Sequence, residues 1–384
     1  MDQTLGPLPY HREVAAVLDV EHPKAFAALL PTGSAPESEV HESLLRHAYR
    51  LDPAGHPIPH AAVARAAAAL DVQVPVELFA VEGRLGGNAE LIFVPERPVI
   101  VLSGDTLNLL DADELCAVVG HELAHYVLWT VDGGRHLATS RLLDAAETDA
   151  RTDAEYLETA RRLRLATELF ADRGALLSCG SLTTTLRALL KLTTGLADVD
   201  PDGYLRQAAE VDLGKPSSGT SHPETVLRAW ALQEWQRDNE AAEPAIARAL
   251  GGLLDLSTLD VLDQNRLRGL TETLVRSVLL DAAMRTDDVI DHAARFGVKT
   301  SDTGPVEIVV DDLAAETRRY LACVLLDFAT VDAELGADGI ARMFLLARRQ
   351  GLGPELDKLL GSELDLSDRA RNKVRARVEE LAGA

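Results

Sequence analysis

The sequence contains few of the residues that cross-link secreted proteins or attract nucleic acid. Its 384 residues include three cysteines, Cys116, Cys179 and Cys323, which are far apart, so we expect a reducing compartment rather than a disulfide framework. Acidic residues outnumber basic ones by 61 to 38, and the net charge of −23 disfavours nucleic acid and anionic lipid as partners. No apolar run approaches the roughly 18 residues of a membrane span, and no signal peptide is visible. We therefore expect a cytoplasmic protein without membrane insertion.

Aromatic residues are scarce as well, at 4%, whereas hydrophobic residues make up 47% of the chain. A core built mainly from leucine, valine and alanine favours helices. Three runs bounded by glycine, proline or asparagine have the composition of strands, at 74–81, 90–94 and 98–102. Apolar residues at three- and four-residue spacing predict helices at 111–130, 153–177, 182–194 and 223–237. The polar stretch 132–152 is interpreted as a mobile loop or a short helix.

These patterns predict an α+β protein, mostly helical around a small sheet, in three regions. Residues 1–57 form a helical arm interrupted by prolines, residues 58–238 form the mixed domain, and residues 239–384 form an all-helical domain. Part of the last region resembles the TerB-type helical domains of tellurite resistance, although Asp332-Ala333-Glu334 replaces the usual Asp-Gly-Glu. The alternative is a helical bundle that packs on the mixed domain or binds a protein partner.

The most informative motif is His121-Glu122-Leu123-Ala124-His125, within the predicted helix 111–130. Four residues advance an α-helix by about 400°, so both imidazoles project from one face. Two such nitrogens can occupy adjacent corners of a zinc tetrahedron, and Glu122 can take a proton from water that the metal acidifies. This is the H-E-x-x-H arrangement of metallopeptidases. The alternative is a polar helix face with two solvated histidines.

A catalytic zinc also needs a third protein ligand and an open position. Glu168 and Asp172 are four residues apart in the predicted helix 153–177, so they lie on one face among apolar neighbours. Glu168 can be the third ligand, and Asp172 can accept a hydrogen bond from the far nitrogen of a ligand histidine. The alternative is an ordinary acidic pair on a helix surface.

A third element is Ser221-His222-Pro223, followed by Arg228. Zinc-dependent hydrolysis leaves a negative oxygen on the tetrahedral intermediate, which a histidine and an arginine can stabilise. The structural alternative is a capping box formed by Ser221 and Glu224, with proline in the first helical turn. The residues alone leave these two interpretations open.

Taken together, these residues resemble the HtpX-type zinc metalloendopeptidases, a gluzincin family that also includes the CAAX prenyl-protein endopeptidases. The resemblance runs from about residue 60 to residue 237 and keeps the order of the motifs. It implies a zincin-like metallopeptidase domain at 58–238 and Zn²⁺ as the cofactor. The implied zinc ligands are His121, His125 and Glu168.

The resemblance also implies roles for the other matched residues. Glu122 is the general base, and Asp172 is the hydrogen-bond partner of a ligand histidine. His222, together with Arg228, steadies the oxyanion. Asn88 and Ala89 begin an edge strand on which an extended peptide adds by main-chain hydrogen bonds.

The chain departs from the family in two respects. The family usually has phenylalanine after Asn-Ala, whereas Glu90 stands here, so the local substrate contact does not transfer. Many relatives carry transmembrane helices or a signal peptide and this chain shows neither, so a role in membrane-protein quality control does not transfer either.

The sequence therefore predicts a zinc metalloendopeptidase that cleaves peptides or unfolded proteins with a zinc-bound water activated by Glu122. The alternative is a zinc-stabilised binding or scaffold protein of a stress or defence system, with a latent or inactive protease site. Glu122 favours the enzyme, because a purely structural site has no use for a base beside its ligands. A structural zinc would also normally be closed by a fourth protein ligand.

Overall fold

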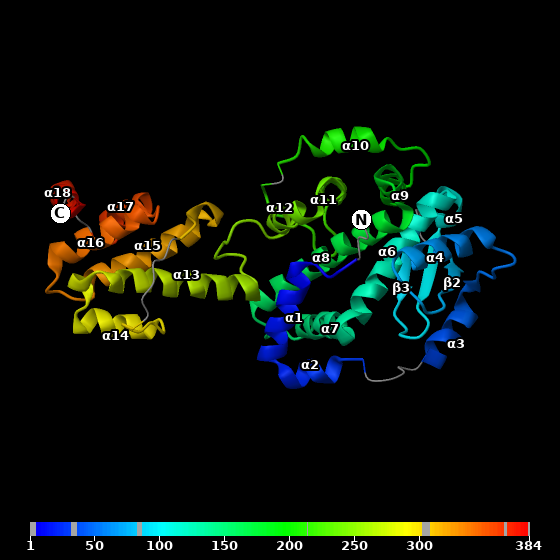
Figure 1. Ribbon diagram of the computed structural model, residues 1–384, viewed down its shortest axis with the longest axis horizontal. Helices are drawn as coiled ribbons and strands as arrows, with labels where there is room; N and C mark the ends of the chain where they lie inside the picture. The colour runs from blue at the N-terminus through cyan, green and yellow to red at the C-terminus, as the bar shows by residue number, and fades with distance from the viewer. Residues whose placement is uncertain are drawn as a thin grey trace. The chain divides into compact units, whose positions relative to one another are not determined.

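The computed structural model describes residues 5–31, 37–82, 87–212, 214–301, 308–364 and 367–382. By their contacts the residues form two compact units, Met1–Gly252 and Leu253–Ala384 (Figure 1). Over the described ranges the protein is mostly helical with a four-stranded sheet, which confirms the predicted α+β class with a helical C-terminal region. None of the helices in these ranges is long and apolar enough to cross a lipid bilayer.

In the first unit, helices surround a small sheet. Two of them, α6 (Ala112–Thr130) and α8 (Ala154–Cys179), pack closely together and carry the motif residues. The N-terminal part contributes α1 (Pro9–Glu21), α2 (Pro23–Leu29), α3 (Glu37–His47) and α4 (Pro57–Ala69). The remainder contributes α5 (Thr106–Leu109), η1 (Val131–Gly134), α7 (Arg135–Glu147), α9 (Leu182–Thr194), α10 (Pro201–Ala208), α11 (Thr225–Arg237) and α12 (Asn239–Gly251).

The sheet consists of β1 (Tyr49–Arg50), β2 (Glu77–Val81), β3 (Gly87–Ile92) and β4 (Val99–Gly104). Its order is β1-β2-β4-β3, so β3 lies at an edge. β2 and β4 are parallel, whereas both outer strands pair antiparallel with their neighbours. The face that includes Ile100 and Leu102 packs in the main core with α4 and α6, and Phe79 and Val101 form a smaller cluster with Leu44 of α3 on the other face.

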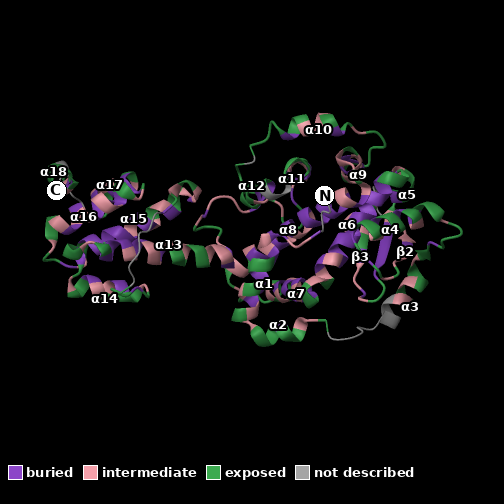
Figure 2. Ribbon diagram, in the orientation of Figure 1, coloured by how far each residue is buried: buried purple, intermediate pink, exposed green. Residues whose placement is uncertain are grey.

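Helix α6 begins at a capping box, where the predicted helix 111–130 starts. Asp111 Oδ1 accepts hydrogen bonds from the backbone of Asp113 and Glu114 at 2.9 and 2.8 Å, and Glu114 Oε2 accepts one from the Asp111 backbone at 2.9 Å. The fully buried Glu114 also accepts a hydrogen bond of 2.8 Å from Lys191 Nζ of α9. Figure 2 shows α6 buried along most of its length, as expected for a helix that is apolar on nearly every side.

The regional boundaries differ from those drawn on the sequence. Helix α12 packs on α11 and α8, so the first unit extends to Gly252 instead of ending near residue 238. The arm predicted at 1–57 belongs to the same unit, because α1 packs on α7 and α8 and β1 joins the sheet. The stretch 132–152 is mainly helix α7. That 58–238 is a domain in its own right stays a prediction.

The second unit consists of helices around its own core. Its elements are α13 (Val261–Leu280), η2 (Ala282–Met284), α14 (Asp287–Arg295), η3 (Val310–Asp312), α15 (Ala315–Thr330), α16 (Gly336–Arg349), α17 (Gly353–Ser362) and α18 (Asp368–Ala382). Phe328 and Met343 are among the buried residues between them. Asp332 lies between α15 and α16 and accepts a hydrogen bond of 2.8 Å from the Glu334 backbone. The TerB-like identity of this unit stays a prediction.

Two glycines allow α6 and α8 to approach closely. A Cβ atom on Gly120 of α6 would overlap the side chain of Ser178 and lie 3.2 Å from the Gly174 carbonyl oxygen. A Cβ atom on Gly174 of α8 would overlap Ala124 and lie 3.2 Å from the Gly120 carbonyl oxygen. The two backbones therefore meet where neither side has room for a methyl group. His121 follows Gly120 directly, so this contact sets the distance between the motif-bearing helix faces.

We predict that Gly120→Ala lowers the free energy of unfolding by about 1–3 kcal/mol, because overpacking forces the helices apart. The matched control is Gly269→Ala in α13, where nothing lies within 4 Å of the added methyl group. That control should be neutral or stabilising by about 0.5–1 kcal/mol, since alanine is the better helix former. Denaturant titration measures both variants. An equal gain in stability for the two would show that the α6–α8 contact is not tight.

A buried histidine makes the stability of the first unit depend on pH. His11 of α1 is 1% exposed, and its Nδ1 accepts a hydrogen bond of 3.2 Å from the Leu8 backbone. Because a neutral imidazole has one acceptor and one donor nitrogen, its Nε2 donates to Thr167 Oγ1, at 3.2 Å. Burial, reinforced by the neighbouring His136, lowers the pKa of His11 to about 3. The unfolded chain takes up a proton below pH about 6.5, whereas the folded chain does not. The contribution of His11 to the free energy of unfolding is therefore complete above that pH and is lost as the pH falls toward 3.

We predict that His11→Gln reduces the loss of unfolding free energy between pH 7 and pH 5 by about 2 kcal/mol, because the unfolded chain no longer gains this proton. Urea titrations at both pH values measure the difference. His47→Gln, at an exposed position on α3, is the control and should keep the pH dependence of the parent protein. An unchanged pH dependence in His11→Gln would contradict the assignment.

Candidate metal centre

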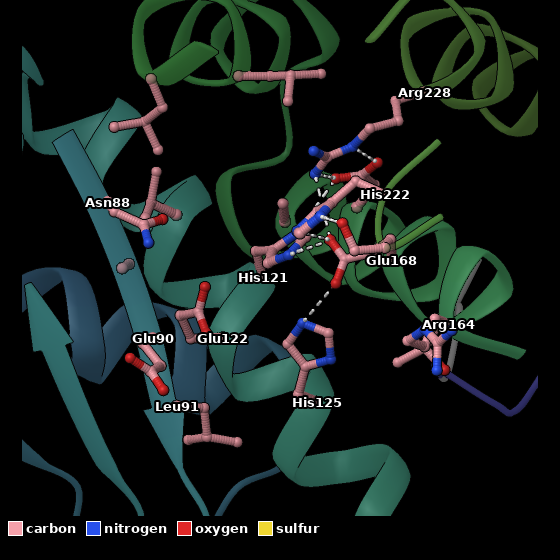
Figure 3. A pocket seen from close by; sticks show the side chains of 18 of the residues that line it. Asn88, Glu90, Leu91, His121, Glu122, His125, Arg164, Glu168, His222 and Arg228 are labelled. Atoms are coloured by element: carbon pink, nitrogen blue, oxygen red, sulfur yellow. Dashed lines mark hydrogen bonds and ion pairs between the residues drawn. The ribbon is translucent and has the colours of Figure 1, made fainter. Parts of the chain in front are cut away.

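The residues singled out in the sequence converge on one cavity. The cavity has a volume of about 610 Å³ and is bounded by β3, α6, α7, α8, α9 and the segment before α11. Its lining includes all of the predicted site residues, which are Asn88, Ala89, His121, Glu122, His125, Glu168, Asp172, His222 and Arg228. Figure 3 shows most of them, with Glu122 on the side of the cavity nearest β3 and Glu168 on the opposite side.

Three side chains are arranged to hold a metal ion. His121, His125 and Glu168 each offer a ligand atom, and these atoms lie within 4.8 Å of one another. Nε2 of His121 is 3.4 Å from Glu168 Oε2, and Nε2 of His125 is 3.7 Å from Glu168 Oε1. Glu168 Oε2 is buried and accepts no hydrogen bond from the described residues. Two imidazole nitrogens and a carboxylate oxygen suit Zn²⁺, so the donor set fits this ion.

A buried salt bridge supports the first of these three side chains. Asp172 Oδ1 lies 3.2 Å from Nδ1 of His121, whereas Nε2 of the same ring is the nitrogen near Glu168. Arg228 of α11 forms a bidentate pair with Asp172, with distances of 2.7 Å from Nε to Oδ2 and 2.6 Å from Nη2 to Oδ1. Arg228 Nη2 is 4.0 Å from Glu168 Oε2. Its closest contacts are therefore with Asp172, which in turn orients the His121 ring.

The electrostatics of the site favour a cation between the ligands. Burial alone would lower the pKa of His121, but Asp172 and Glu168 outweigh burial and raise this pKa to about 10. Burial and the neighbouring His121 lower the pKa of His125 to about 4. Although burial acts to raise the pKa of Glu168, His121 and other neighbouring cations keep it below its usual value. The two carboxylates thus attract positive charge to the ligand cluster, which a proton or a metal ion can supply.

Glu122 is a buried carboxyl group that lines the cavity next to His121. It is 7% exposed, and burial raises the pKa of its carboxyl group to about 7. A general base works best when its pKa lies near the operating pH. His125, one turn further along α6, stacks on Trp129 with a centroid distance of 5.6 Å and an interplanar angle of 28°. This contact restricts the orientation of the second ligand ring.

His222 reaches the site from an irregular segment before α11. Its Nε2 is 3.3 Å from Glu168 Oε2, and 58% of its side chain is exposed. The capping box proposed for Ser221 and Glu224 is wrong, because Ser221 Oγ lies 3.0 Å from His222 Nδ1 and α11 has Glu224 itself as N-cap residue. The Glu224 carboxylate instead accepts hydrogen bonds from Ser217 and Ser218.

Two arginines that the sequence analysis missed hold this segment in place. Arg161 Nη1 donates to the carbonyl oxygens of Ser217 and Gly219 at 3.1 and 2.9 Å. Arg164 donates to the Thr220 carbonyl oxygen at 3.3 Å and pairs with Glu147. Both precede Glu168 on α8 by one or two helical turns, so they share its face. The sequence shows this spacing, but it does not show which carbonyl oxygens accept the hydrogen bonds.

Two histidines and a glutamate beside an edge strand of the described sheet are the arrangement of a metallopeptidase-like domain. Residues 59–236 match Peptidase family M48, so this part of the chain is a Peptidase family M48 domain. The match confirms the predicted resemblance and supports metallopeptidase activity in general.

One relative carries the same family number in its name. The plastoglobule-localized metallopeptidase 48 of Arabidopsis thaliana chloroplasts is 31% identical over 204 residues, which are 47% of this chain and 57% of that protein. The match thus spans little more than half the length of this relative. No solved structure matches the chain.

We predict that Arg161→Lys loosens the segment that carries His222, because lysine cannot bond the two carbonyl oxygens while also pairing with Glu158. Loss of the hydrogen bonds that the charged Arg161 side chain donates should make local opening of this segment about tenfold faster. Hydrogen-exchange mass spectrometry of peptides covering 217–223 measures this rate. Arg151→Lys, which alters an exposed pair with Asp149, is the control and should leave the exchange unchanged. Equal protection in both variants would contradict the role of Arg161.

Proposed function

We propose that this protein is a zinc-dependent metalloendopeptidase whose catalytic base is Glu122. The observation that carries the proposal is the convergence of His121, His125 and Glu168, with ligand atoms within 4.8 Å of one another, beside Glu122. A zinc ion held there would acidify a water molecule and polarise the carbonyl group of a peptide bond. The Peptidase family M48 match supports this activity class.

The other residues of the site then each have a defined task. Glu122 takes a proton from the attacking water and later delivers it to the departing amine. Asp172, fixed by Arg228, holds His121 in the tautomer that leaves Nε2 free to bind metal. His222 faces the cavity beside Glu168 and can donate a hydrogen bond to the oxygen that becomes negative.

The free edge of β3 is the part of the cavity where a peptide can lie extended. Among the described strands β3 pairs with β4 alone, and Asn88 and Ala89 of β3 line the cavity. An extended peptide can add to such an edge through main-chain hydrogen bonds, which do not depend on sequence. This supports peptides or unfolded segments as substrates. Location in the cytoplasm and a protein partner for the helical C-terminal unit stay predictions.

A second candidate is a binding or scaffold protein with an inactive site. The net charge of −23 and the helical second unit are compatible with it. The place of Glu122 in the cavity beside the candidate ligands favours the enzyme, because a structural metal site needs no base. Cleavage of an unfolded protein by the zinc-loaded chain, abolished by a chelator and restored by zinc, distinguishes the two.

We predict that Glu122→Gln binds zinc as the parent protein does but loses cleavage by at least about a hundredfold, since removing a general base costs this much or more. Zinc content is measured by mass spectrometry of dialysed protein, and cleavage with unfolded casein. His121→Ala should instead lower the zinc content from about one ion per chain, with the exposed His47→Ala as control. Full cleavage by Glu122→Gln would remove Glu122 from the base role, and unchanged zinc in His121→Ala would remove the ligand assignment.

A further inference from the structure

The edge strand of the cavity carries an acidic side chain that the proposed chemistry does not use. Along β3, Asn88 and Glu90 are exposed, whereas Ala89 and Leu91 pack toward the core shared with α6. Glu90 lines the cavity on the strand that passes Glu122 (Figure 3). Because side chains alternate along a strand, Glu90 projects on the sheet face opposite to Leu91 and beside the free edge.

The charge of Glu90 is not neutralised within the described part of the chain. No hydrogen bond or ion pair joins its side chain to another described residue, and Glu90 is exposed. The basic side chains of the cavity wall are already paired. Arg164 binds Glu147 at 2.7 and 2.8 Å, and Arg228 binds Asp172. A positive group that enters along β3 therefore meets a free carboxylate there.

We propose that Glu90 makes this site select peptides that carry lysine or arginine at the position opposite it, so that the substrate class is extended cationic peptide. This inference rests on the proposed function, because it assumes that the peptide adds to β3. In an antiparallel pair, directly opposite Cβ atoms are about 4.5–5.5 Å apart, within reach of a lysine or arginine side chain. An acidic residue at that position is repelled by Glu90.

A purely protective role for Glu90 makes a different prediction. Charged residues on edge strands also prevent edge-to-edge association of sheets, and a charge of either sign serves that purpose. Under that explanation, replacing Glu90 by lysine keeps the protein soluble and changes cleavage of all peptides alike. Under the proposal, the same change reverses the charge preference at one substrate position.

The test uses the full-length, zinc-loaded protein and a fluorogenic peptide derived from a site that it cuts in unfolded casein. At each of the few residues around the cut bond, lysine, glutamine or glutamate is placed in turn. We expect one position where lysine exceeds glutamate in kcat/KM by about two- to tenfold, the range of a cross-strand charge pair. Glu90→Gln should remove this preference and Glu90→Lys should invert it. Glu96→Gln, an exposed change in the turn after β3, should retain it.

A second measurement separates this inference from the proposed activity. Fluorescence anisotropy with zinc-loaded Glu122→Gln and with the double variant Glu122→Gln/Glu90→Lys reports binding without cleavage. It uses labelled casein-derived peptides that are chosen without reference to any cut and carry lysine, glutamine or glutamate at each position in turn. A lysine preference that inverts with Glu90→Lys and weakens with added salt supports the proposal, even if nothing is cut and the peptidase assignment fails. The same charge preference with and without Glu90, or binding of no peptide, overturns it.

Discussion

The close contact between α6 and α8 is the constraint on which the rest of the site depends. Gly120 and Gly174 remove the side chains that would separate the helices, so His121 and His125 face Glu168 across a short gap. The capping box at Asp111 and the buried pair of Glu114 with Lys191 fix the start of α6. The packing of α6 on α8 therefore places the three candidate ligand side chains near one another.

The buried charges form a connected series that ends at Arg228. Arg228 is paired with Asp172, Asp172 contacts His121, and His121 lies next to Glu168. Buried charged groups are costly unless each is paired, and here the negative members exceed what the one arginine can neutralise. A divalent cation among the ligands would balance the charge. The same surplus explains why the pKa of His121 is raised to about 10 although burial opposes it.

Local patterns in the sequence predicted much of this arrangement. The start of α6, the bounds of α9 and the order of the motif residues all follow from residue types at short spacing. The sequence could not predict contacts between distant segments, such as the hydrogen bonds from Arg161 to the Ser217 and Gly219 carbonyl oxygens. It also missed β1, because a two-residue strand carries no periodicity of its own. The first unit extends past residue 238 for the same reason, since α12 packs on helices far away in sequence.

X-ray absorption spectroscopy at the zinc edge of the full-length protein identifies the atoms that bind the ion. We expect about four nitrogen and oxygen atoms around it, at roughly 2.0–2.2 Å, with scattering from two imidazole rings. His121→Ala should remove the scattering of one ring. A sulfur atom in the coordination shell, a third imidazole, or zinc that washes out of the parent protein would contradict the assignment of His121, His125 and Glu168 as the ligands.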